Sequence, residues 1–156
     1  MIDANLFHPV GTYLGRKFHR QSPQVEGGVT YPTHGIRVNA KIKELCRKEK
    51  ISILCLESED LVNIMRTHSF PWASKTQLAT YLGWALTYEG VVLLNATLLR
   101  NAKPCLLNYV VLHEIEHIRY VETDEDITDR NAKALARRLG LDISCAKYNE
   151  GRVGQS

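Results

Sequence analysis

The stretch His113-Glu114-Ile115-Glu116-His117 decides how the rest of this sequence is interpreted. Residues four positions apart lie on one face of an α-helix, so the two imidazoles can bind one metal ion. Glu114 lies beside the first histidine and can reach a water molecule bound to that ion. The pattern therefore predicts a helix that carries two metal ligands, His113 and His117, and a general base, Glu114.

The residues before this stretch extend the predicted helix towards the N-terminus. The run from Leu106 to Leu112 is largely apolar and contains no Gly or Pro, and Pro104 suits a first helical turn because its missing N–H costs nothing there. A buried face is expected from residues that recur at helical spacing, namely Leu107, Val111, Ile115 and Ile118. A third, mostly polar side is expected at Asn108, Leu112, Glu116 and Arg119.

The composition is typical of one soluble globular domain. The chain has 156 residues, of which 44% are hydrophobic and 24% are charged, so it is long enough to bury a sizeable core. Its formal net charge of +3 is too small to indicate a nucleic-acid-binding protein. A nucleic acid is therefore not expected as a partner.

The cysteines and the N-terminal sequence favour a cytoplasmic protein. Cys46, Cys55, Cys105 and Cys145 are widely separated and form no Cys-x-x-Cys pair, so we expect all four to stay reduced. No basic segment followed by an apolar run stands at the N-terminus, and no apolar stretch is long enough to span a bilayer. Membrane insertion and export are therefore not expected.

Glycine and proline divide the chain into three segments. Residues 1–36 are rich in both and predict an irregular N-terminal strap, residues 37–145 predict the folded domain, and residues 146–156 predict a flexible tail. The strap contains a small basic cluster, which comprises Arg16, Lys17, His19 and Arg20. This cluster is interpreted mainly as a solvated patch.

Within the domain, the hydrophobic pattern alternates between helical and strand spacing, which predicts an α+β fold. A helix is expected at 37–48, a strand at 51–57 and a short helix capped by Ser58. Two further strands, at 81–88 and 91–94, are separated by Glu89-Gly90, which predicts a hairpin with a two-residue turn. The last helix is expected at 123–140, with Gly140 as its terminator.

A zinc ion held by two histidines needs a third protein ligand. No histidine follows His117, and on the last helix Asp129 shares a face with small residues, Ala132, Ala136 and Gly140, which permit close packing. Asp129 is therefore the expected third ligand. Glu125, one turn earlier, and Glu122 are the alternatives.

This order of elements resembles the ImmA/IrrE-like zinc metallopeptidases, which are gluzincins with a compact zincin-like domain. The residues that carry the resemblance are the apolar lead Val110-Val111-Leu112, the His-Glu-x-x-His motif and the helix that contains Asp129. In that family the third ligand is normally Glu in a helix rich in small residues, and here Asp129 stands in its place. The resemblance implies a small sheet or hairpin packed on the motif helix, and a ligand on the helix that follows.

These observations predict a cytoplasmic, zinc-dependent endopeptidase that acts on a protein or peptide substrate. The resemblance implies a regulatory substrate such as a transcriptional repressor. An alternative hypothesis is a binding or regulatory module that keeps a zincin scaffold without turning over substrate, although Glu114 favours catalysis because ligands alone need no general base beside them. A third hypothesis, a DNA-associated protein that uses the basic N-terminal segment, has little support from the modest charge.

Overall fold

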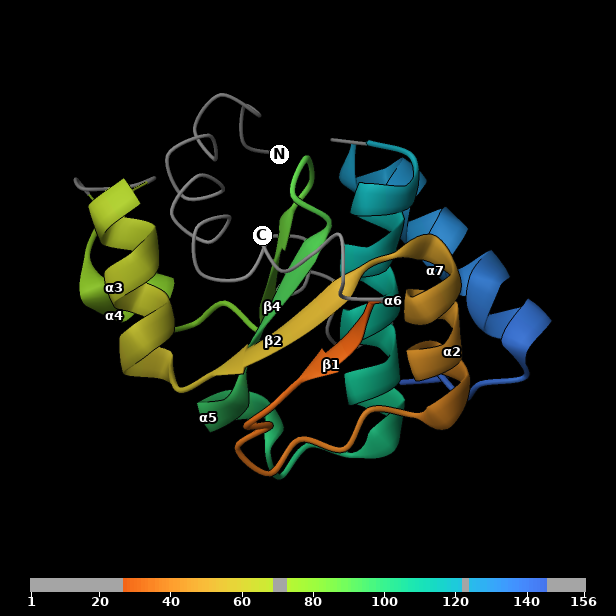
Figure 1. Ribbon diagram of the computed structural model, residues 1–156, viewed down its shortest axis with the longest axis horizontal. Coiled ribbons are helices and arrows are strands. Elements are labelled where there is room, and N and C mark those ends of the chain that lie inside the picture. Colours follow the sequence, from red (N-terminus) through yellow and green to blue (C-terminus); the bar gives the residue numbers. More distant parts are fainter. Residues whose placement is uncertain (1–26, 69–72, 122–123, 146–156) are drawn as a thin grey trace.

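The computed structural model describes residues 27–68, 73–121 and 124–145 (Figure 1). In this part of the chain, four strands form one mixed sheet in the order β1-β2-β4-β3. Strands β1 (Gly28–Thr30), β2 (Ser52–Leu56) and β4 (Val91–Asn95) run parallel, and β3 (Gly83–Leu86) pairs antiparallel with β4 at one edge. The α+β class expected from the sequence is confirmed.

Helices cover both faces of the sheet because successive side chains of its central strands point to opposite sides. Ile53 and Val92 pack with α2 (Ala40–Glu49), α6 (Pro104–Arg119) and α7 (Glu125–Leu139). Leu54 and Leu93 pack on the other face with α3 (Ser58–His68) and α4 (Lys75–Leu78). Figure 1 shows these two groups of helices on opposite sides of the strands, with the short α5 (Ala96–Leu99) near the lower ends of β1 and β2.

Helix α6 is buried on every side between the sheet and its neighbouring helices. Every residue from Leu107 to His117 is buried, including Asn108 and Glu116 on the side that was expected to be mostly polar. Burial raises the pKa of Glu116, although the Arg119 guanidinium at 3.1 Å opposes this effect. The side of α6 that was expected to be polar is therefore buried as well. Glu116 can occupy this buried position because it forms an ion pair with Arg119.

The ends of α7 agree with the capping signals of the sequence. The side chain of Asp124 accepts hydrogen bonds from the backbone N–H groups of Asp126 and Ile127, and Gly140 ends the helix with a φ of 68°. Acidic residues in the first turn and arginines in the last turn complement the helix dipole. The helix predicted at 123–140 is therefore confirmed, although it begins two residues later and ends one residue earlier than expected.

The connection between β3 and β4 is longer than the expected two-residue turn. Strand β3 ends at Leu86, and its carbonyl oxygen accepts hydrogen bonds from the backbone N–H groups of Glu89 and Gly90. Gly90 has a φ of 70°, a conformation that glycine adopts without steric cost. The hairpin is confirmed, but four residues rather than two join its strands.

Two expectations about the ends of the domain are corrected. Residues 28–30 of the segment expected to be irregular form strand β1, because Gly28 to Thr30 pair with Ser52 to Leu54 at the sheet edge. Cys105 and Cys145 form a disulfide rather than staying reduced, since α7 returns along α6 and brings their Cα atoms to 6.1 Å. Spacing could not reveal this pair, which lies 40 residues apart in the sequence.

Cys46 and Cys55 are free and buried, and burial raises their pKa values to about 12 and about 11. Residues 1–26, which include the basic cluster, and residues 146–156 lie outside the described residues. None of the helices in the described ranges is long and apolar enough to traverse a lipid bilayer.

Asn95 offers a test of how the end of β4 is stabilised. Its side chain is fully buried, its amide nitrogen contacts the carbonyl oxygens of Ala79 and Tyr81, and its oxygen accepts a hydrogen bond from the Leu98 N–H. Asn95→Ala should lower the free energy of unfolding by about 2–4 kcal/mol, because it leaves buried carbonyls unpaired. Urea denaturation measures this loss, and Asn101→Ala at an exposed position should change stability little.

Candidate metal centre

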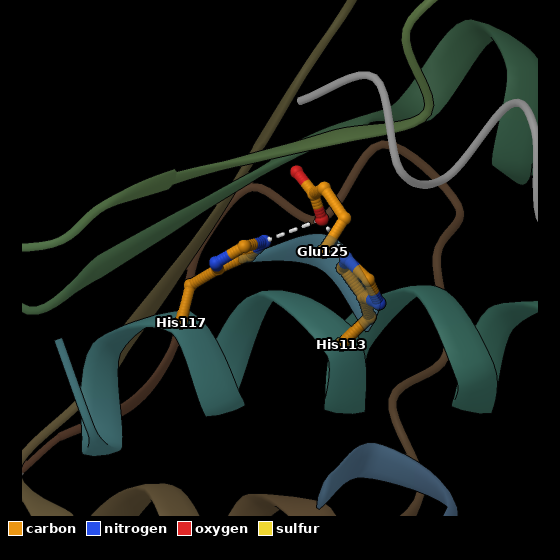
Figure 2. A group of neighbouring side chains, drawn as sticks. All are labelled: His113, His117 and Glu125. Carbon is orange, nitrogen blue, oxygen red and sulfur yellow. Dashed lines mark hydrogen bonds and ion pairs between the residues drawn. The ribbon is translucent and has the colours of Figure 1, made fainter. Parts of the chain in front are cut away.

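Three side chains from two helices meet at one point (Figure 2). His113 and His117 extend from α6, and Glu125 reaches them from the first turn of α7. Glu125 Oε2 lies 2.8 Å from His113 Nε2 and 3.1 Å from His117 Nε2. One candidate ligand atom of each residue lies within 4.8 Å of the others, so the three can hold one metal ion.

The group is buried from the side of α6 and reaches solvent on the side of α7. His113 and His117 are 1% and 0% exposed, whereas the side chain of Glu125 is 26% exposed. The imidazoles are therefore fixed by packing against the core. Glu125 is the partly exposed member of the group.

The electrostatics of the group favour an ionised carboxylate. Burial acts to raise the pKa of Glu125, but hydrogen bonds and charge interactions with His113 and His117 outweigh it and lower the pKa below its usual value. An ionised carboxylate beside two imidazole nitrogens is the form in which these three groups bind a divalent metal.

Two buried polar atoms at this site have no hydrogen-bond partner among the described residues, namely His113 Nδ1 and Glu125 Oε1. A buried polar atom without a partner costs free energy. Glu125 Oε1 belongs to a candidate ligand, and coordination by the carboxylate would compensate its burial. The donor set of two imidazoles and one carboxylate therefore fits a metal such as zinc.

His117 has a second contact on α7. Thr128 Oγ1 lies 3.3 Å from His117 Nδ1 and 2.8 Å from the carbonyl oxygen of Asp124. Thr128 belongs to the first turn of α7 and is fully buried. The same turn of α7 thus supplies both the carboxylate of Glu125 and the neighbour of the second histidine.

The structure does not place Asp129 beside the imidazoles, where it was expected, and Glu125 lies there instead. Its carboxylate accepts a hydrogen bond from the Tyr109 hydroxyl and pairs with Lys133 at 2.9 Å. The helices run antiparallel, so one turn towards the C-terminus of α7 corresponds to one turn towards the N-terminus of α6. Asp129 therefore meets Tyr109, one turn before His113, and Glu125 meets the two histidines.

The face of small residues on α7 packs as the sequence predicted. Ala132 and Ala136 are buried in the core against α6, as expected for a face of small residues. The alternative ligand named from the sequence, Glu125, is the carboxylate that joins the group. Glu122 lies outside the described residues.

The side chain of Glu114, on α6, points towards the edge strand β3. A Cβ atom placed on Gly83 would come within 3.2 Å of Glu114 Cγ and 3.1 Å of Val110 Cγ1, so glycine permits this close approach. Glu114 is fully buried. Sequence reasoning missed Gly83 and Thr128, although a glycine inside a strand pattern is a signal of close backbone approach.

The comparisons with known proteins identify no relative. No family model matches the chain, and neither the curated proteins nor the solved structures contain a significant match.

Substitutions at the two carboxylates of α7 distinguish their roles. We expect the unaltered protein to bind about one zinc ion per chain, and Glu125→Gln to weaken binding by about 100-fold or more because a neutral amide replaces a charged ligand. Asp129→Asn, which alters the carboxylate one turn away, should have a much smaller effect. Isothermal titration with zinc measures both, and the reverse ranking would restore Asp129 as the ligand.

Proposed function

We propose that this chain is a zinc-dependent peptidase with a zincin-like domain. The observation that carries the proposal is the convergence of His113, His117 and Glu125 at one point, together with Glu114, which follows His113 directly in α6. A second helix that supplies a glutamate to a His-Glu-x-x-His helix is the ligand pattern implied by the resemblance to the ImmA/IrrE-like peptidases. The antiparallel strand β3 next to this helix is also consistent with it.

In the proposed reaction, Glu114 is the general base and general acid. Bound zinc would supply Lewis-acid chemistry, which makes water a nucleophile near neutral pH. Glu114 takes a proton from the attacking water and later delivers it to the nitrogen of the leaving amine, so one carboxylate serves both steps. His113, His117 and Glu125 hold the ion and take no part in proton transfer.

The position of β3 supports a peptide substrate. Among the described strands, β3 lies at one edge of the sheet, and its Gly83 packs directly on Glu114. An extended peptide can add to such an edge by backbone hydrogen bonding, which is a general mode of peptide recognition. Added in this way, a peptide bond would pass close to the general base.

The proposal includes a regulatory protein, such as a transcriptional repressor, as the substrate, and this part rests on the resemblance alone. A cytoplasmic location belongs to the same proposal. The Cys105–Cys145 disulfide argues against a cytoplasmic location, because disulfides persist mainly in oxidising compartments.

Replacement of the general base separates catalysis from metal binding. Glu114→Gln should retain zinc and the fold but reduce peptide hydrolysis by at least about 100-fold, because the amide keeps the shape of the side chain and cannot accept the proton. Cleavage of a fluorogenic peptide library, together with zinc analysis of the same sample, measures both properties. Full activity in this variant contradicts the assigned role, and zinc binding without any hydrolysis by the unaltered protein supports the non-catalytic module instead.

Substitution of Gly83 tests whether Glu114 depends on the edge strand. Gly83→Ala should lower the hydrolysis rate by about tenfold or more, because the added methyl group displaces Glu114 or Val110 by a few tenths of an ångström. Zinc affinity should change little, since neither displaced side chain is a ligand. Unchanged steady-state kinetics in this variant would show that the contact has no catalytic role.

A further inference from the structure

We infer that Thr128 is a positioning residue that fixes the tautomer and orientation of His117 for metal binding. This inference rests on the proposed metal centre and concerns a residue that provides no ligand atom. It extends the site beyond the three side chains that converge on the ion.

The hydrogen bonds of the Thr128 hydroxyl favour a proton on His117 Nδ1. The hydroxyl has one proton, and the carbonyl oxygen of Asp124, 2.8 Å away, can only accept it. Towards His117 Nδ1, at 3.3 Å, the hydroxyl therefore presents a lone pair. This contact, at the long end of the hydrogen-bond range, is favourable when Nδ1 carries a proton and donates it.

A proton on Nδ1 leaves the Nε2 lone pair of a neutral imidazole free for a metal ion. His117 Nε2 faces Glu125 Oε2 at 3.1 Å, where without an ion it can donate a proton to that carboxylate, and a bound ion would replace this proton while Nδ1 keeps its own. The opposite tautomer would lose the contact with Thr128 and place an N–H group where the ion binds. Ligand histidines in metal sites are commonly held by such a partner on the other ring nitrogen.

The backbone around Thr128 is itself held in place. Asp124 caps α7 with its side chain, and its carbonyl oxygen accepts both the backbone N–H and the hydroxyl of Thr128. The side chain of Thr128 has no exposed surface and therefore little rotamer freedom. The acceptor for His117 is thus built into the first turn of the helix that also carries Glu125.

The two histidines are held in different ways. His113 Nδ1 is buried without a hydrogen-bond partner among the described residues, and its ring packs edge-on against Tyr109 with centroids 5.9 Å apart. His117 has the hydroxyl of Thr128 instead. A loss of the hydroxyl should therefore affect His117 specifically.

The test compares Thr128→Val, which keeps the branched shape and removes the hydroxyl, with Thr128→Ser, which keeps the hydroxyl. Zinc affinity is measured by competition with a chelator at one pH, and the protonation of the His117 ring nitrogens is measured by ¹⁵N NMR. We expect the Val variant to bind zinc about 10–100-fold more weakly and the Ser variant to remain within about threefold of the unaltered protein. The Nδ1 proton should be present in the unaltered and Ser forms and lost from the metal-free Val form.

Several outcomes would overturn the inference. Equal zinc affinity in all three proteins would show that the hydroxyl does not matter, and equally weak binding by Val and Ser would show that side-chain shape matters instead. A His117 ring protonated at Nε2 alone in the unaltered, metal-free protein also overturns it, even where the Val variant fails to fold. Because the NMR measurement needs no metal, it tests Thr128 separately from the proposed enzymatic function.

Discussion

The antiparallel packing of α7 against α6 is the constraint on which the candidate centre depends. Ala132 and Ala136 bring the helices close together, and this closeness lets Glu125 reach both imidazoles. The same register places Asp129 at Tyr109 and Thr128 at His117. A relative shift by one helical turn, about 5.4 Å, would exchange these partners and remove the carboxylate from the histidines.

The burial of α6 also helps to hold the candidate centre in place. The two histidines and Glu114 are held by the core, and such pre-organisation would support the proposed metal binding and catalysis. Glu125 is the partly exposed member of the group. The centre therefore combines a rigid half from α6 with a more accessible half from α7.

The sequence predicted the elements of this fold better than their contacts. Periodicity and capping signals are local, and they predicted the ranges of α6 and α7 and the strands of the hairpin. They also placed His113 and His117 on one helical face. The sequence placed Asp129 beside the histidines, where the structure has Glu125, because helical spacing fixes a face and leaves the register between helices open. The disulfide, the position of β1 and the contact of Thr128 with His117 were missed for the same reason, since each depends on how separate segments pack together.

The Cys105–Cys145 bond has a consequence for how the helix pair comes apart. It joins the start of α6 to the segment after α7, and the closed loop spans both helices, so a chain-entropy estimate gives about 4 kcal/mol of stabilisation. The bond lies at the end of the pair opposite to Glu125, so partial opening would be a hinge motion about the disulfide in which the first turn of α7 moves furthest. Exchange of a bound ion would then require only fraying of that turn, while the rest of the helix stays docked.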